Sequence, residues 1–115
     1  MTNRSLSEFL QDILDALAEI ERFTAGVDAA SFTANREKIL AVVKLLEMVG
    51  EAVKQVPNDI RIRYPNIPWK SVAGMKDILV HEYWDIDVAV VWATVQESLP
   101  PLKITILDIL EHTEK

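Results

Sequence analysis

The sequence predicts an all-α fold, an antiparallel bundle of four to five helices in a single domain over residues 1–115. Apolar residues recur three and four positions apart through most of the chain, the spacing of a helix with one buried face. The five prolines lie only at the borders of these periodic segments. No segment shows the strict alternation of a half-buried strand, although the β-branched run Val88–Val91 leaves a strand open there. At 115 residues the chain suits one domain with its own core.

The first helix is predicted to begin at a capping box, with Ser5 as N-cap and Glu8 three residues later. Its apolar stripe then continues for five turns and consists of Leu6, Phe9, Leu10, Ile13, Leu14, Leu17, Ile20 and Phe23. Five acidic residues occupy other positions of this helix, Glu8, Asp12, Asp15, Glu19 and Glu21. Gly26 is expected to end this helix.

The second helix is predicted to be capped by Ser31 or Thr33 and to stop before Pro57. Its buried stripe is formed by Ile39, Val42, Val43, Leu46, Val49 and Val53. Gly50 and Ala52 are small, which indicates that another helix approaches closely at this point.

Prolines make the segment that follows irregular. A short turn is expected at 59–63, and Pro65 and Pro68 disfavour a helix over 64–68. Pro68 suits the first turn of a third long helix, roughly 69–84.

A fourth helix is predicted to be capped by Asp85 or Asp87. Pro100-Pro101 is expected to break it. The residues from Leu102 onward then form a last helix or the continuation of a kinked one.

Charge and composition exclude several classes of protein. With a net charge of −6, the protein lacks the positive electrostatic field that is typical of nucleic-acid-binding proteins. The absence of cysteine excludes disulfides and thiolate chemistry. No apolar run is long enough to span a membrane, and the N-terminus does not resemble a signal peptide, so we expect a cytoplasmic protein.

One window of the sequence is nevertheless basic. Between residues 54 and 76 only Asp59 is acidic, against five basic residues, Lys54, Arg61, Arg63, Lys70 and Lys76. Arg61, Arg63 and Lys70 are therefore candidates for RNA binding, and Trp69 is a candidate for stacking on a base.

The basic window leads into the candidate active site, the segment 74–84. On a continuous helix, Asp77 and His81 would face each other across one turn, and Lys76 and Tyr83 would lie on the edge of the same stripe. A neutral imidazole can take a proton from a ribose 2′-hydroxyl, and a neighbouring cation can stabilise the charge that develops on the phosphate. The group therefore suits chemistry on a phosphate ester.

Each of these residues also has a purely structural interpretation. His81 alone would be a core or surface residue, Lys76 a solvated cation, and Tyr83 an amphipathic residue at the rim of the core. Glu47 and Glu51, one turn apart, would form a solvated face, unless Glu51 turns inward as a partner for Lys76 or His81. The spacing of the two histidines fits no metal site, and the scattered glycines exclude a P-loop, so we expect no cofactor.

Several short motifs occur in the order found in one known family. They are Asp12-Ile13-Leu14, Phe23-Thr24-Ala25-Gly26, Leu46 to Lys54, Tyr64 to Trp69, Ala73 to Tyr83, and Leu99-Pro100-Pro101-Leu102. Together they resemble the HepT-like family of the HEPN superfamily, the toxins of bacterial and archaeal HEPN–MNT toxin–antitoxin modules. The resemblance covers nearly the whole chain.

The resemblance implies an all-α homodimer that acts as a metal-independent endoribonuclease. The family signature is an arginine, four to six residues, a histidine, one residue and a tyrosine. His81 and Tyr83 match it, Asp77 takes the polar position that often follows the arginine, and Lys76 stands in place of the arginine. Lysine keeps the charge but lacks the planar fork that grips a phosphate. The resemblance also implies an MNT nucleotidyltransferase antitoxin that transfers AMP onto Tyr83.

The leading hypothesis is therefore an RNA-cleaving toxin with His81, Lys76 and Asp77 as catalytic residues, and with Glu51 as support. The rival hypothesis is a non-catalytic HEPN module that docks a nucleotidyltransferase or a nucleotide, in which Lys76 marks lost activity. A third interpretation is a helical bundle whose site residues are only structural.

Overall fold

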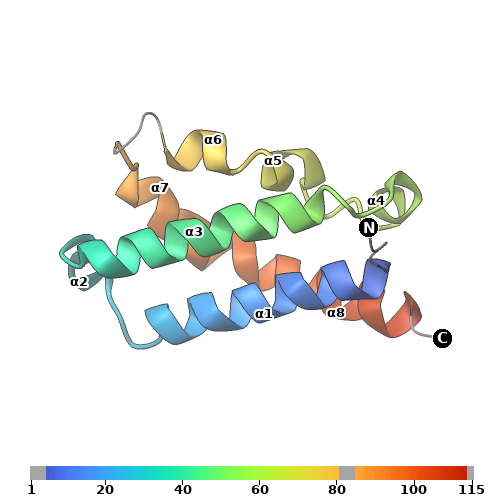
Figure 1. The fold of residues 1–115 in the computed structure, drawn as a ribbon, viewed down its shortest axis with the longest axis horizontal. Coiled ribbons are helices and arrows are strands. Elements are labelled where there is room, and N and C mark those ends of the chain that lie inside the picture. The colour runs from blue at the N-terminus through green and yellow to red at the C-terminus, as the bar shows by residue number, and fades with distance from the viewer. Residues whose placement is uncertain (1–4, 81–84, 114–115) are drawn as a thin grey trace.

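The computed structural model describes residues 5–80 and 85–113, and these residues form a helical bundle with extents of 44 × 29 × 29 Å. Three long helices run along its long axis: α1 (Leu6–Thr24), α3 (Arg36–Val53) and α8 (Leu99–Thr113), with α1 and α3 antiparallel (Figure 1). The shorter elements are α2 (Ala29–Thr33), α4 (Asn58–Arg63), α5 (Trp69–Ala73), α6 (Lys76–Leu79), α7 (Val88–Ala93) and the π-helix η1 (Thr94–Ser98). The predicted all-α bundle is confirmed. In the described part of the chain, no helix is long and apolar enough to cross a membrane.

The first helix follows its sequence signals closely. The Ser5 hydroxyl accepts a hydrogen bond from the Glu8 backbone N–H at 3.3 Å, and the Glu8 carboxylate accepts one from the Ser5 N–H, which completes the predicted capping box. Gly26 follows the end of α1 with a φ of +72°, a left-handed conformation that glycine adopts without strain. The helix therefore starts and stops where the sequence predicts.

The predicted cap of the second helix is wrong. Ser31 and Thr33 lie inside the short helix α2, which Asp28 caps by accepting a hydrogen bond from the Ser31 N–H at 2.8 Å. Asn35 then caps α3, accepting from the Lys38 N–H at 3.0 Å. Short acidic and amide side chains serve as caps at least as well as hydroxyls do, and here they take both positions.

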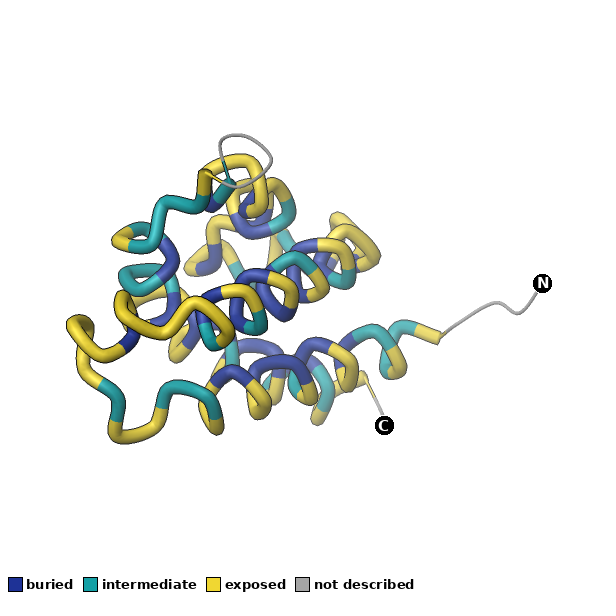
Figure 2. Tube along the Cα trace, turned by 60° about the vertical axis from the view of Figure 1, so that its left-hand side comes forward, coloured by how far each residue is buried: buried dark blue, intermediate teal, exposed yellow. Residues whose placement is uncertain are grey.

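The core lies where α1, α3 and α8 face one another. Leu10, Ile13, Leu46, Val49 and Ile106 are fully buried. Figure 2 shows the buried positions running along the inner sides of the long helices. The apolar spacing read from the sequence therefore identifies the buried faces.

Asp87 caps α7 through its side chain, which accepts a hydrogen bond from the Val90 N–H at 3.2 Å. This agrees with one of the two predicted caps, and the run Val88–Val91 is helical rather than extended. The ring of Trp92 on α7 packs against that of Phe32 on α2, with the ring centroids 5.0 Å apart.

The predicted break at Pro100-Pro101 is wrong. The chain passes from α7 through η1 into α8, and the Leu99 N–H donates to the carbonyl oxygen of Thr94, five residues earlier. Both prolines lie in the first turn of α8, where a missing backbone N–H and a fixed φ are tolerated. The π-turn thus allows one helical segment to continue past the prolines. This agrees with the alternative prediction, in which the last helix continues the fourth one with a kink.

Candidate functional site

The chain from Trp69 to Val80 does not form the single long helix predicted over 69–84. Helix α5 ends at Ala73 with Gly74 as its C-cap, α6 covers only Lys76–Leu79, and Val80 is extended. Val80 forms an isolated antiparallel bridge with Ile86, and the Asp87 N–H donates to the Leu79 carbonyl oxygen at 2.8 Å. Glycine weakens a helix interior, and the bridge takes the chain out of the helix after Leu79.

This early end of α6 removes the basis for placing Asp77 and His81 on facing turns of one helix. His81 and Tyr83 lie outside the described residues, so their predicted roles stay predictions. The structure does describe both flanks of this segment, which meet at the bridge between Val80 and Ile86.

Helix α6 is held against α3 by close packing of the backbone just before it. A Cβ atom added to Gly50 of α3 would lie 3.1 Å from the carbonyl oxygen of Val72 and 3.3 Å from that of Ala73. The predicted close approach at Gly50 is therefore confirmed. Met75 and Leu79 are buried and anchor α6, whereas Lys76 and Asp77 are exposed.

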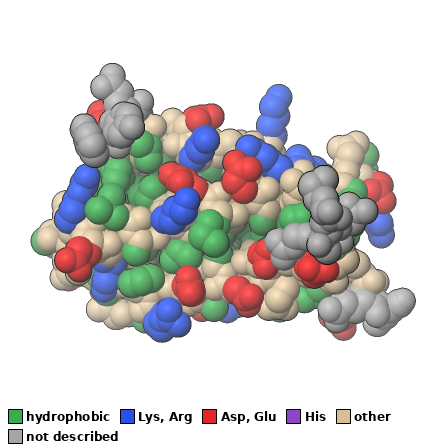
Figure 3. All heavy atoms as spheres, in the orientation of Figure 1, with side chains coloured by type: hydrophobic (Ala, Val, Ile, Leu, Met, Phe, Trp, Pro, Cys, Tyr) green, Lys and Arg blue, Asp and Glu red, His purple; other side chains and the backbone are tan. Residues whose placement is uncertain are grey.

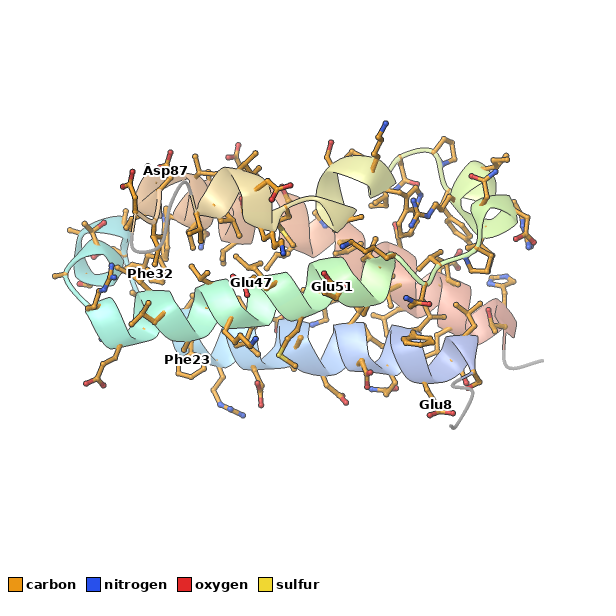
Figure 4. All side chains as sticks on the ribbon, turned by 45° about the horizontal axis from the view of Figure 1, so that its top comes forward. Glu8, Phe23, Phe32, Glu47, Glu51 and Asp87 are labelled. Atoms are coloured by element: carbon orange, nitrogen blue, oxygen red, sulfur yellow. The ribbon has the colours of Figure 1, made fainter. Side chains whose placement is uncertain are left out.

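Lys76 lines a groove of about 660 Å³ between α1 and α3, which we call the α1–α3 groove. Its lining residues are Phe9, Asp12, Asp15, Ala16 and Glu19 of α1, Lys44, Leu45, Glu47, Met48, Glu51 and Ala52 of α3, and Gln55 and Lys76. Glu47 and Glu51 lie in one row along the same side of α3 (Figure 4). Lys76 therefore borders an acidic surface.

Glu51 lies on a solvated face, as the structural interpretation predicts, and the alternative of an inward-turned Glu51 supporting Lys76 or His81 is wrong. Its side chain is 62% exposed and accepts a hydrogen bond from the Lys54 Nζ at 3.0 Å. This bond and the charge of Lys54 lower the pKa of the Glu51 carboxyl, and the charge of Lys76 lowers it further by a smaller amount. Glu51 is thus an exposed carboxylate shared electrostatically between two lysines.

Two members of the basic window serve the fold. The Arg61 guanidinium donates from Nε to the carbonyl oxygen of Val56 and from Nη2 to that of Val53, both at 3.0 Å, and so caps the end of α3. Trp69 is 6% exposed, and its indole N–H donates to the Tyr64 carbonyl oxygen at 3.0 Å. A buried ring cannot stack on a base, so the described position of Trp69 does not fit that predicted role.

The remaining basic candidates are not gathered into one surface. Arg63 is exposed on α4 and pairs with Asp59 at 3.6 Å, and Lys70 is exposed on α5. Helices α4 and α6 lie apart along the long axis of the molecule (Figure 1). Arg63 and Lys76 therefore lie at separate places along the molecule, with Lys70 of α5 between them.

The sequence interpretation missed the carboxylates that α1 contributes to the groove. Asp12, Asp15 and Glu19 lie three and four residues apart, the spacing of one helix face, and this signal was present in the sequence. His112 lies elsewhere, exposed near the end of α8, with Nδ1 2.8 Å from the Asp108 carbonyl oxygen. Over residues 5–80 and 85–113, no group of three histidine, aspartate or glutamate side chains could hold a metal ion.

Comparison with known proteins identifies relatives along almost the whole chain. The "Probable ribonuclease HepT" of Thermococcus cleftensis is 42% identical over 100 residues, which is 87% of this chain and 91% of that protein. The "Putative RNase MJ0125" of Methanocaldococcus jannaschii is 40% identical over 115 residues, covering 100% of this chain and 99% of that protein. No solved structure matches the chain significantly.

The family model described as "Ribonuclease HepT-like" matches residues 13–109. That range includes α3, the segment from Lys76 to Tyr83 and most of α8. The chain therefore belongs to the HepT-like ribonuclease family.

Proposed function

We propose that this protein is a metal-independent endoribonuclease, the toxin of a type II toxin–antitoxin system. The observation that carries the proposal is the family match over residues 13–109, which contains every residue of the candidate signature from Lys76 to Tyr83. The names of the relatives support it, because two proteins at least 40% identical to this chain are called an RNase or a ribonuclease.

The proposed reaction is an internal transfer of the RNA phosphodiester. Neutral His81 takes the proton of a ribose 2′-hydroxyl while that oxygen bonds to the phosphorus. The bond between the phosphorus and the 5′-oxygen of the next nucleotide then breaks, and the leaving oxygen receives a proton from the imidazolium of His81, which becomes neutral again. The products are a 2′,3′-cyclic phosphate and a free 5′-hydroxyl. Neither an oxidant nor a metal is required.

Lys76 is proposed to stabilise the negative charge that grows on the phosphate oxygens in the transition state. Its exposure at the start of α6 supports this role, since the ammonium can reach a bound strand. Asp77 takes the polar position of the family signature, and on that ground it is proposed to orient His81. As an ammonium, Lys76 provides a point charge in place of the two parallel hydrogen bonds of an arginine, so we expect slower cleavage than an arginine would give.

Regulation is proposed to act on Tyr83. An MNT-type nucleotidyltransferase antitoxin would transfer AMP to the Tyr83 phenol oxygen, placing a bulky anion two residues from His81. The added phosphate would occupy space and repel the RNA phosphate. We further propose a homodimer, in which a two-fold axis brings two such sites together.

Cleavage of total RNA and transfer RNA in EDTA, with analysis of the new ends, tests the proposal. Cyclic phosphate and 5′-hydroxyl ends are expected from the wild type. Phosphate left on the 5′ end, or a requirement for added metal, would refute the mechanism.

A second candidate function is a non-catalytic module that docks a nucleotidyltransferase or a nucleotide. It is favoured by the five carboxylates of the α1–α3 groove, because they disfavour the binding of a polyanion beside Lys76. If the protein is such a module, Lys76→Arg would create little or no cleavage activity, whereas an impaired enzyme would gain activity from the same substitution.

A further inference from the structure

The floor of the α1–α3 groove is apolar and reaches the surface. Met48 is 51% exposed and lies next to buried Leu45 and Ala16, with Phe9 and Ala52 half-buried. Figure 3 shows hydrophobic side chains at the surface between α3 and α1, with acidic side chains on both sides. An exposed apolar strip bordered by charge is typical of a surface that binds another protein.

The groove has the length of a short helix. It extends from Phe9 to Glu19 along α1 and from Lys44 to Ala52 along antiparallel α3, with Gln55 just beyond the end of α3. At a rise of about 1.5 Å per residue, the walls are about 12–15 Å long, which matches about two to three turns of a third helix laid between the two. Two parallel walls with an apolar floor form the type of groove that receives an amphipathic helix.

The charge of the walls determines which kind of helix fits. Five carboxylates and two lysines line the groove, so its field is negative. Asp15 accepts a hydrogen bond from Gln11 at 3.0 Å and Glu51 one from Lys54. Among the described residues, Glu47 forms no ion pair, which leaves its carboxylate available for a cation. Along the groove, this field favours a lysine- or arginine-rich helix over an RNA strand.

We propose that the α1–α3 groove is the docking site for a basic amphipathic helix of a protein partner. The apolar face of that helix would cover Met48 and the floor around it, and its cations would reach the carboxylates of both walls. Because Lys76 lines the same groove, the bound helix would lie against α6. The proposal concerns binding and holds whether or not the protein cleaves RNA.

A synthetic peptide tests it directly. The probe is a helical peptide of about 18 residues with leucines on one face and lysines on the other, and the control peptide has the same composition in scrambled order. Calorimetric titration would compare the wild type with Met48→Asp and with the double variant Glu19→Gln/Glu47→Gln. The matched control is Glu37→Gln/Glu97→Gln, which removes the same charge from exposed positions outside the groove.

We expect the patterned peptide to bind the wild type with one-to-one stoichiometry and the scrambled peptide to bind far more weakly. Met48→Asp and the double groove variant should each weaken binding by about tenfold or more, and the matched control by less than about twofold. Circular dichroism confirms that every variant is folded.

Three results would overturn the proposal. Equal loss of affinity in the groove and control variants would mean attraction by net charge alone. A single-stranded RNA that binds the groove when the peptide does not would assign the surface to RNA. A wild-type dimer that Met48→Asp converts to monomers, seen by sedimentation, would assign the groove to a second copy of this chain.

Discussion

The carbonyl oxygen of Val72 lies 3.1 Å from the place where a Cβ atom of Gly50 would be. This contact sets the distance between α5 and α3, and α6 with Lys76 follows directly along the chain. The position of the candidate site relative to the bundle therefore depends on the absence of a side chain at residue 50.

Gly50→Ala is expected to lower the free energy of unfolding by about 1 kcal/mol. The methyl group would press on two backbone carbonyls, a cost of about 1–3 kcal/mol, against a gain of about 1 kcal/mol in helix propensity. Urea denaturation measures the difference. The matched control is Gly74→Ala, because a Cβ there would meet only the Lys70 carbonyl oxygen at an ordinary 3.6 Å. A Gly50→Ala variant as stable as Gly74→Ala would contradict this account of α5.

Arg61→Met is expected to lower stability by about 1–3 kcal/mol, because the carbonyl oxygens of Val53 and Val56 lose a charged donor. Arg63→Met is the control, since its 67% exposed side chain pairs only with exposed Asp59. That change should cost less than about 1 kcal/mol. Equal losses would show that Arg61 does not cap α3.

The pKa of Glu51 is expected to respond more to Lys54 than to Lys76. Lys54→Met removes both a hydrogen bond and a charge and should raise this pKa toward its ordinary 4.5, whereas Lys76→Met should raise it less. Since the pKa is lowered in the folded protein, the stabilisation is present above 4.5 and is lost as the pH falls through the lowered value. NMR titration of the side-chain carboxyl measures both shifts. A larger effect of Lys76→Met would mean that Lys76, and not Lys54, is the main cation acting on the Glu51 carboxylate.

Lys76→Arg is expected to increase RNA cleavage by about tenfold or more, because arginine provides two parallel donors to the phosphate. Lys103→Arg is the control, since Lys103 pairs with Glu21 at 2.9 Å on another face of the bundle. Initial rates on one RNA substrate compare the three proteins. No gain over the control would favour the non-catalytic module.

The sequence signals that predicted the fold correctly depend on residues close together in the sequence or on the size of a single residue. The capping box of Ser5 and Glu8 is set by residues three apart, and the buried stripe of α1 follows from its own spacing. The close approach at Gly50 was predicted from residue size alone. Each of these three features can be predicted without knowing how the other helices pack.

Apart from the cap predicted at Ser31 or Thr33, the wrong predictions depended on contacts outside a single helix or on unusual backbone. The helix predicted over 69–84 ends at Leu79 because Val80 pairs with Ile86, and nothing in the apolar spacing reveals that bridge. Trp69 sits in a basic window of the sequence but is buried in the core, since helix packing rather than sequence proximity decides its exposure. Pro100 is tolerated because a π-turn precedes it, a rare element that proline alone does not predict.

The candidate site was predicted only in part. Lys76 and Asp77 are exposed together on α6, as a site requires, but the carboxylates that α1 contributes to the groove beside Lys76 were not predicted. Their approach to Lys76 results from α1 packing against α3, which the sequence of neither helix shows by itself.

The most direct test of the proposed function compares RNA cleavage by the wild type and by His81→Ala, both in EDTA. Both proteins must be folded by circular dichroism and unmodified at Tyr83 by mass spectrometry. We predict that the wild type cleaves transfer RNA without metal and that the variant loses this activity. Equal cleavage by both proteins, or none by the wild type, would contradict the claim that His81 performs metal-independent RNA cleavage.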